Sequence, residues 1–310
     1  MPNPLKSAFL REVTERFGRP KMLEGSKSLY EVGENAVRLY FRYSKRLPLN
    51  RTFFGLRKVD LQVLEGHAGI ICFCWEGQRE PLFLPFDQFE EVFASLPAAN
   101  DGQIKAQVYE QTEGTELYLA RGGRFNVESY MGWECLDAAI KSSSEGIPNL
   151  THNQVQTLLG AIGNSKGFDI WIPPIDRFAL DWNLAPKFKP LLSFPKSLEK
   201  VREVAKEIDV IWIDRGLGTP VAMYEVEHST PIYSGLLRFN DVQLEMSPQN
   251  LRFGIVSNEE RRALFIRQLA RPTFKRSHLA DICTFFQYEN VFGWHERARK
   301  ISTAIPELTH

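Results

Sequence analysis

The stretch from Ile208 to Thr230 constrains this chain most strongly, because it places carboxylates at the ends of two short apolar runs. The runs cover 208–213 and 221–227, and a segment with two glycines and a proline joins them. Short runs rich in Ile, Val, Trp and Tyr, bounded by glycine and proline, are typical of a β-hairpin. A carboxylate is rarely buried without a partner or a metal. The acids of this hairpin therefore need an explanation.

The two-residue period of a strand predicts how three of these acids are arranged. Glu225 and Glu227 share one face of the second strand. If Asp209 lies opposite Glu225 in an antiparallel pair, it joins them on that face, and the turn centres on Leu217. In this register Asp214 falls near the turn, on the other face. Crowded carboxylates repel unless protons or cations intervene, so we expect a hard divalent cation such as Mg²⁺. The alternative is an ordinary strand with solvated acids on its polar face.

The elements around the hairpin predict an α/β sandwich with a mixed sheet flanked by helices. Thr151 is expected to cap a helix that runs to Ser165 and that has an apolar face at i, i+3, i+4, i+7 spacing. Asn258 is expected to cap a later helix whose core face includes Ile266. Arg238 is expected to be solvated, although it could reach a phosphate. The remaining ranges predict, in order, a strand at 168–172, a helix at 197–207, a helix at 232–242, a strand at 251–256, a helix at 259–270, a strand at 285–291 and a helix at 292–303.

The order of Asp209, a loop and Glu225, Val226 and Glu227 resembles the active-site hairpin of the PD-(D/E)XK, or restriction-endonuclease-like, nucleases. The resemblance covers about 150–305 and implies a restriction-endonuclease-like C-terminal domain. The usual pattern ends in lysine; this chain has Glu227 there, as some type II restriction enzymes do. Many relatives also carry an acid on the first helix, where this chain has Asn153, Gln154 and Gln156.

The resemblance implies a Mg²⁺-dependent endonuclease that hydrolyses phosphodiester bonds in double-stranded DNA, with Mn²⁺ able to substitute. Asp209, Glu225 and Glu227 would be the catalytic residues. Asp209 and Glu225 would hold the metal, with the carbonyl of Val226 as a further oxygen ligand. Glu227 would orient or deprotonate the attacking water, and the products would carry a 3′-hydroxyl and a 5′-phosphate.

Residues 1–137 predict a mainly β, pseudobarrel-like domain with an N-terminal helix at 5–17 and a weaker helix at 26–33. Small β pseudobarrels ahead of a restriction-type nuclease are often DNA-recognition modules, and the likeness here is one of architecture alone. Residues 138–150 are rich in serine and include Gly146 and Pro148, which predicts a linker. The nuclease-like catalytic domain would then cover 151–310.

A segment without any acid runs from Arg38 to Lys58. Basic residues interleaved with aromatic ones suit contacts with phosphates, with bases or sugars packed alongside. The alternative is a solvated basic face with aromatic residues in the core. We call its basic residues the basic stripe; they are Arg38, Arg42, Lys45, Arg46, Arg51, Arg57 and Lys58.

The composition of the chain limits the cellular compartment and the kinds of partner that we expect. No apolar run approaches the ~20 residues that span a bilayer, and no apolar signal region follows the first methionine. The four cysteines lack metal or redox spacing, so we expect reduced, buried thiols in a cytoplasmic protein and no zinc site. The expected partner is double-stranded DNA, without a membrane; a homodimer or other restriction or defence subunits are also compatible.

Two other functions are compatible with parts of the pattern. The absent lysine and helix acid favour a catalytically inactive nuclease fold that binds DNA within a restriction or defence system. The triplet of carboxylates argues against it, because a surface that only binds phosphate gains nothing from three negative charges. A glycosidase with two carboxylates fits poorly, because glutamates two residues apart on one strand do not flank a sugar.

Overall fold

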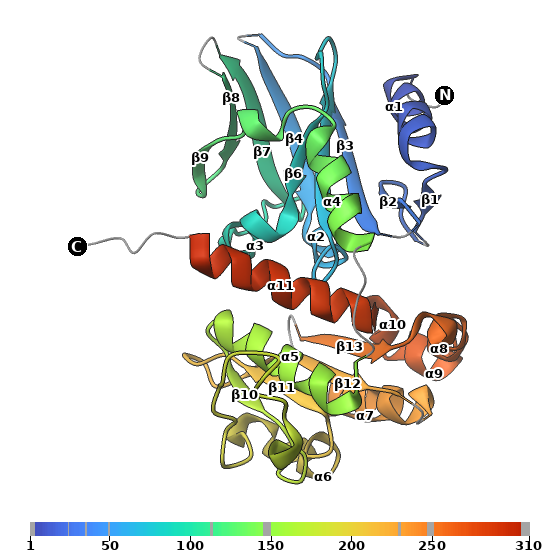
Figure 1. Ribbon diagram of the computed structural model, residues 1–310, viewed down its shortest axis with the longest axis vertical. Coiled ribbons are helices and arrows are strands. Elements are labelled where there is room, and N and C mark those ends of the chain that lie inside the picture. Colours follow the sequence, from blue (N-terminus) through green and yellow to red (C-terminus); the bar gives the residue numbers. More distant parts are fainter. Residues whose placement is uncertain are drawn as a thin grey trace, which may run out of the picture. The chain divides into compact units, whose positions relative to one another are not determined.

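The computed structural model describes residues 4–23, 25–34, 36–48, 50–111, 114–144, 150–228, 231–246 and 251–304 (Figure 1). The chain divides into two compact units, residues 1–146 and 147–310. Each unit has two hydrophobic core clusters of its own. None of the helices in the described ranges is long and apolar enough to cross a membrane.

The first unit is mainly β, and its described strands form two sheets that share a core. One sheet has the order β1 (Lys21–Met22), β2 (Leu29–Val32), β3 (Val37–Ser44), β5 (Gly69–Trp75) and β6 (Leu82–Pro85). The other has the order β4 (Arg51–Arg57), β7 (Gln103–Gln111), β8 (Gly114–Leu119) and β9 (Gly123–Asn126). Buried residues alternate along β7 and β8, so one face of this sheet packs on the core. Because the two sheets are hydrogen-bonded separately, the pseudobarrel stays a prediction.

The helices of the first unit are α1 (Pro4–Phe17), α2 (Lys58–Gln62), α3 (Phe86–Ser95) and α4 (Glu134–Ser144), with a 3₁₀ turn at Glu128–Tyr130. The helix predicted at 5–17 is confirmed. The helix predicted at 26–33 is wrong, because all four residues of β2 are buried and pair with β3. Pairing with a neighbouring strand determines the secondary structure of this segment, because its sequence has little periodicity of its own.

The range predicted as a linker, 138–150, is helical in its first half. Helix α4 continues to Ser144 because Leu136 is buried, and Ala139 and Ile140 pack against the same core. The linker prediction is therefore wrong for 138–144, and residues 145–149 lie outside the described ranges. All four cysteines are free thiols, and Cys135 at the start of α4 is half-buried.

The second unit is an α/β sandwich around a five-stranded mixed sheet. The sheet order is β10 (Asp169–Trp171), β11 (Val210–Ile213), β12 (Pro220–Val226), β13 (Arg252–Ser257) and β14 (Cys283–Gln287). The first three strands pair antiparallel and the last three pair parallel, which confirms the predicted mixed sheet.

Helices cover both faces of this sheet (Figure 1). Along β11 and β12, alternate side chains join one core with α5 (His152–Ser165) and α11 (Tyr288–Ala304), and the others join a second core with α7 (Ile232–Met246). The remaining helices are α6 (Arg202–Ala205), α8 (Arg262–Leu269), α9 (Pro272–Arg276) and α10 (Leu279–Ile282), with 3₁₀ helices at Arg177–Ala179, Lys196–Val201 and Glu259–Arg261.

Several predicted boundaries in this unit need correction. The helix expected at 197–207 is mostly 3₁₀, and the one expected at 259–270 divides into a 3₁₀ turn and α8. Phe265 and Leu269 are buried while Ile266 is 47% exposed, so the prediction of Ile266 on the core face is wrong. Asn258 precedes this helix without a capping hydrogen bond from its side chain. Strand β14 ends at Gln287, four residues earlier than expected, because α11 begins there.

Candidate functional site

The hairpin of β11 and β12 has the predicted register. Val210 pairs with Tyr224, and continuing this pairing by one residue sets Asp209 opposite Glu225. The Val226 amide donates to Oδ2 of Asp209 at 2.6 Å, which ties the carboxylate to the facing strand. Asp214 lies at the turn, where its Oδ1 accepts hydrogen bonds from two backbone amides. The sequence therefore predicted correctly which aspartate stands beside the glutamates.

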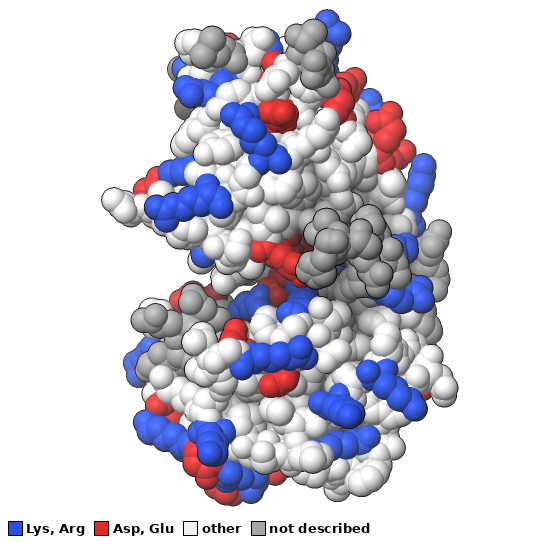
Figure 2. Space-filling view, turned by 90° about the vertical axis from the view of Figure 1, so that its left-hand side faces the viewer, with Lys and Arg blue, Asp and Glu red and all other residues white. Residues whose placement is uncertain are grey.

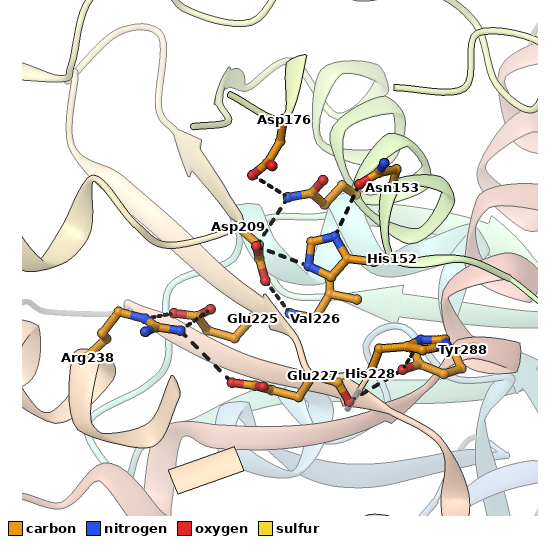
Figure 3. A network of polar contacts seen from close by, with 11 residues as sticks. His152, Asn153, Asp176, Asp209, Glu225, Val226, Glu227, His228, Arg238 and Tyr288 are labelled. Carbon is orange, nitrogen blue, oxygen red and sulfur yellow. Dashed lines mark hydrogen bonds and ion pairs between the residues drawn. The ribbon is translucent and has the colours of Figure 1, made fainter. Parts of the chain in front are cut away.

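Glu225 is buried and held by an arginine. Its side chain is 1% exposed, and Arg238 of α7 donates from Nε to Oε1 at 2.5 Å and from Nη2 to Oε2 at 2.9 Å (Figure 3). Burial is the main cause that raises the pKa of Glu225 to about 8; the charges of Asp209 and Glu227 act in the same direction, and Arg238 opposes them only in part. The prediction of Arg238 as a solvated arginine was wrong.

Glu227 is also buried, with 2% of its side chain exposed, and its Oε1 lies 4.0 Å from Nη2 of Arg238. Its backbone carbonyl accepts hydrogen bonds from Ser257 Oγ and Arg261 Nη1, both at 2.6 Å, and from the Tyr288 hydroxyl at 3.4 Å. These donors come from three different segments. They fix the end of β12, and with it the place from which the two glutamates project.

Asp209 is surrounded by hydrogen-bond donors from helix α5. Its Oδ1 lies 3.2 Å from Nε2 of Gln156 and 3.3 Å from Nε2 of His152 (Figure 3). The hydrogen bond to Asp209 raises the pKa of His152 to about 9, so this imidazole is a cation at neutral pH. Gln156 also donates to Asp176 at 3.3 Å.

Helix α5 therefore reaches the site with an amide and an imidazole, where many members of the resembled family carry an acid. The Thr151 capping box, formed with Gln154, makes His152 the first helical residue. His152 and Gln156 are four residues apart and consequently share a face of the helix. Sequence reasoning missed both roles. This spacing after a capping threonine was the available signal.

Helix α7 comes close to the acids because residue 235 is glycine. A Cβ at Gly235 would lie 2.8 Å from Oε1 of Glu227 and 3.2 Å from Cβ of Glu225. The second contact is with an atom next to the backbone, which has little freedom to move. Arg238 follows one turn later on the same helix, so the same close approach brings its guanidinium to Glu225.

We expect Gly235→Ala to impair the site while leaving the protein folded. The methyl group favours the helix by about 1 kcal/mol, but pushes α7 away from the strand and separates Arg238 from Glu225. Thermal unfolding should still show a cooperative transition of a folded protein, whereas the metal binding and cleavage that the hairpin pattern predicts should change clearly. Gly293→Ala, at a helical glycine of α11 where the added Cβ would meet only the flexible end of the Arg297 side chain, at 3.0 Å, is the control for a glycine replacement as such. Unaltered metal binding and cleavage in Gly235→Ala would contradict the close-approach argument.

The described ranges contain no group of three or more His, Cys, Asp or Glu side chains placed to hold a metal ion. Glu225 is directed to Arg238, and Asp209 to its own three donors. The charges of Asp209 and Glu227 both raise the pKa of Glu225, so the three predicted carboxylates are close enough to interact. Among the described residues they do not form a three-ligand cluster. The oxygen donors of Asp209 and Glu225 still match Mg²⁺, which binds through one or two carboxylates plus substrate phosphate and water.

The basic stripe of the first unit is less uniform than its sequence indicates. Arg38 is 5% exposed, donates to the Val63 carbonyl at 2.8 Å and lies 3.9 Å from Glu31, so it belongs to the fold. Arg46 pairs with Glu110, and Arg57 with Asp60. The exposed members of the stripe outside these pairs are Lys45 and Lys58, and Arg42 and Arg51 are half-buried.

The aromatic residues of the same segment are mostly core. Tyr40, Phe41 and Phe54 are buried, whereas Phe53 is 42% exposed and Tyr43 is half-buried. On the face shown in Figure 2, basic side chains occur in small separate groups, several of them beside acidic groups. Because Arg38 is buried and Arg46 and Arg57 pair with acids, the stripe is not one continuous surface for phosphates, and Arg38 does not belong to its exposed part.

Comparison with known proteins identifies a family for the part of the chain that contains the second unit. The family described as the type II restriction enzyme NmeDI C-terminal domain matches residues 138–308. The type II restriction enzyme NmeDI of Neisseria meningitidis serogroup C is 31% identical over 137 residues, which cover 40% of this chain and 37% of that enzyme. No solved structure matches. Since the family match covers more than half of the chain, this protein belongs to the NmeDI C-terminal domain family of type II restriction enzymes.

Proposed function

We propose that this protein is a Mg²⁺-dependent restriction-type endonuclease that hydrolyses double-stranded DNA with a PD-(D/E)XK-like site. The observation that carries the proposal is the pairing of Asp209 opposite Glu225 at the end of a central hairpin, with Glu227 buried beside them. Burying Glu225 among like charges raises its pKa to about 8 and so costs stability. A binding site for a divalent cation explains why such a costly arrangement is present.

Each residue of the site has a distinct part in this proposal. Asp209 and Glu225 would hold the metal, with the Val226 carbonyl as a further oxygen ligand, and Mg²⁺ would supply polarisation of the scissile phosphate and activation of water. Glu227 orients that water or accepts its proton. Gln156 and His152 hold Asp209 in place through its Oδ1. The first unit recognises the DNA sequence or a base modification.

The direct test is cleavage of genomic DNA, methylated and unmethylated, with Mg²⁺, Mn²⁺ or EDTA. We expect fragments with 5′-phosphates and 3′-hydroxyls in the presence of metal and none with EDTA. A wild-type protein that binds DNA but never cuts, with either metal and in either methylation state, would reject the nuclease.

A DNA-binding subunit without catalysis is the second candidate, and the Arg238–Glu225 pair favours it. A guanidinium that holds both oxygens of a proposed metal ligand is also what an inactivated site would contain. The two candidates differ in metal binding: the inactive fold should bind Mn²⁺ equally poorly before and after Glu225→Gln. The nuclease should lose Mn²⁺ affinity with the same change.

The proposed role of Glu227 predicts a loss of cleavage without a loss of DNA binding. Glu227→Gln keeps the shape of the side chain but removes its charge. Cleavage should fall by roughly 10²–10⁴-fold, the range for general acid–base catalysis, while DNA affinity persists or rises because a negative charge near the phosphate is gone. Single-turnover cleavage and DNA titration measure the two effects. A variant that cuts at the wild-type rate would remove Glu227 from the mechanism, and residual cleavage by Glu227→Lys would indicate that the commoner lysine serves equally.

The exposed part of the basic stripe predicts a salt effect. Lys45→Glu with Lys58→Glu should weaken DNA binding and lower the slope of log K against log salt, by about 0.9 for each phosphate that the protein no longer neutralises. Lys27→Glu, an exposed lysine of the same unit outside the stripe, is the matched control. If both proteins show the wild-type slope, the stripe does not contact DNA.

A further inference from the structure

Arg238 neutralises the most buried acid of the site through both carboxylate oxygens. Its Nε and Nη2 lie 2.5 and 2.9 Å from Oε1 and Oε2 of Glu225, a side-on pair with two parallel hydrogen bonds. Only 1% of the Glu225 side chain is exposed, so water cannot replace these bonds easily. The second acid, Glu227, lies 4.0 Å from the same Nη2. One guanidinium thus serves as a cation for two acids.

This pairing is incompatible with full metal coordination by Glu225. Each oxygen of Glu225 already accepts a hydrogen bond from a positive group, and a divalent cation near them would be repelled by the guanidinium. The side chain of Arg238 is 30% exposed, so its head group can move toward solvent when another cation takes the carboxylate. Its planar fork also matches two oxygens of a phosphate. Helix α7, held close by Gly235, keeps the released guanidinium next to the site.

We propose that Arg238 is a built-in counter-cation of Glu225 that a divalent metal displaces, and that the released guanidinium then binds a phosphate of the DNA. This inference rests on the proposed function and names the residue that links metal binding to DNA binding. Without DNA, the metal must compete with Arg238 for the carboxylate of Glu225. Without metal, DNA must compete with Glu225 for the guanidinium of Arg238. Each therefore favours the other, because each releases the group that the other needs.

Metal affinity without DNA tests the first half, measured as binding of Mn²⁺ by electron paramagnetic resonance above the Glu225 pKa of about 8. Arg238→Gln removes the competing cation and should tighten Mn²⁺ binding by about tenfold or more. Arg238→Lys keeps the charge but loses the paired geometry, and it should also tighten binding, by less. Arg215→Lys, an arginine that pairs with Asp169 at the other end of the hairpin, is the matched control. Unchanged Mn²⁺ affinity in Arg238→Lys would overturn displacement and leave only a charge effect.

DNA affinity in EDTA tests the second half without any metal. Glu225→Gln frees Arg238 and should tighten DNA binding by about tenfold, with one further phosphate contact in the salt slope, a change of about 0.9. Glu227→Gln, measured at the same pH above the Glu225 pKa of about 8, is the matched control, because it changes the neighbouring carboxylate while leaving the Arg238–Glu225 pair in place. The gain should vanish in the double variant Glu225→Gln with Arg238→Gln. Equal gains and equal slopes in Glu225→Gln and Glu227→Gln would overturn the proposal.

These measurements separate the inference from the nuclease itself. Thermal unfolding shows which variants are folded, and if Arg238→Gln is not, the comparison of Glu225→Gln with Glu227→Gln still decides. A wild-type protein that never cuts but shows both binding effects would reject the nuclease and support the displacement of Arg238. A protein that cuts while Arg238→Lys leaves Mn²⁺ affinity unchanged would reject the displacement alone.

Discussion

Asp209→Asn should lower DNA cleavage by at least the 10²–10⁴-fold typical of removing a catalytic group. The carboxylate accepts from the Val226 amide, Gln156 and His152, so all three of these neighbours are donors. An asparagine amide supplies one acceptor oxygen and turns an NH₂ group toward another donor. The substitution therefore removes a charge and also misplaces the end of the hairpin. Single-turnover cleavage with saturating Mg²⁺ measures the effect.

Asp214→Asn is the control for this experiment, because Asp214 lies on the same hairpin and its Oδ1 holds the turn. Asparagine supports the same side-chain-to-backbone turn, so this variant should cut normally. DNA affinity of Asp209→Asn should stay within a few fold of wild type. If Asp209→Asn cuts as fast as Asp214→Asn, the hairpin is not the catalytic site.

Arg238→Met should destabilise the metal-free protein by about 3–5 kcal/mol at alkaline pH, the cost of breaking a buried ion pair. The cost should shrink at lower pH, because Glu225 then becomes neutral. In the wild type the folded-state pKa of Glu225 is about 8, raised from an ordinary value of 4.5. Between these values the folded protein binds a proton that the unfolded chain releases, so stability falls as pH rises. Arg238 lowers this pKa, and its removal extends the fall to higher pH.

Urea unfolding in EDTA, repeated across this pH range, measures both the size of the destabilisation and its slope with pH. The double variant Arg238→Met with Glu225→Gln should recover most of the stability and should lack the slope that Glu225 contributes. If Arg238→Met were destabilised equally at every pH, the effect would come from packing of the arginine stem and not from the buried charge.

The hairpin was predictable because its register depends on local rules. The two-residue period and the turn around Leu217 were enough to place Asp209 opposite Glu225. The side chains around these acids were not predictable in the same way. His152 and Gln156 come from a helix more than fifty residues earlier in the chain, and Arg238 reaches Glu225 only because Gly235 admits α7. Their roles depend on how helices pack on the sheet.

The basic stripe shows the opposite case. Its local pattern was clear, but the pattern alone did not indicate which of its basic residues are buried or paired. An acid-free run with interleaved aromatic residues indicates a binding surface, but the strand pairing of β2 with β3 sets Arg38 opposite Glu31. Charge patterns along a sequence do not include partners from other segments. The same pairing explains why the helix predicted at 26–33 is a strand.

The separate cores of the two units bear on how proteins of this kind diversify. A crossover between Ser144 and Leu150 would divide the gene without splitting any of the four core clusters. The exchanged parts would each carry the contacts that they need to fold. The family match begins at 138, within α4, and covers essentially the second unit. If the second unit is the hydrolytic part, as proposed, new target specificities would arise by joining it to different first units while each core cluster stays whole.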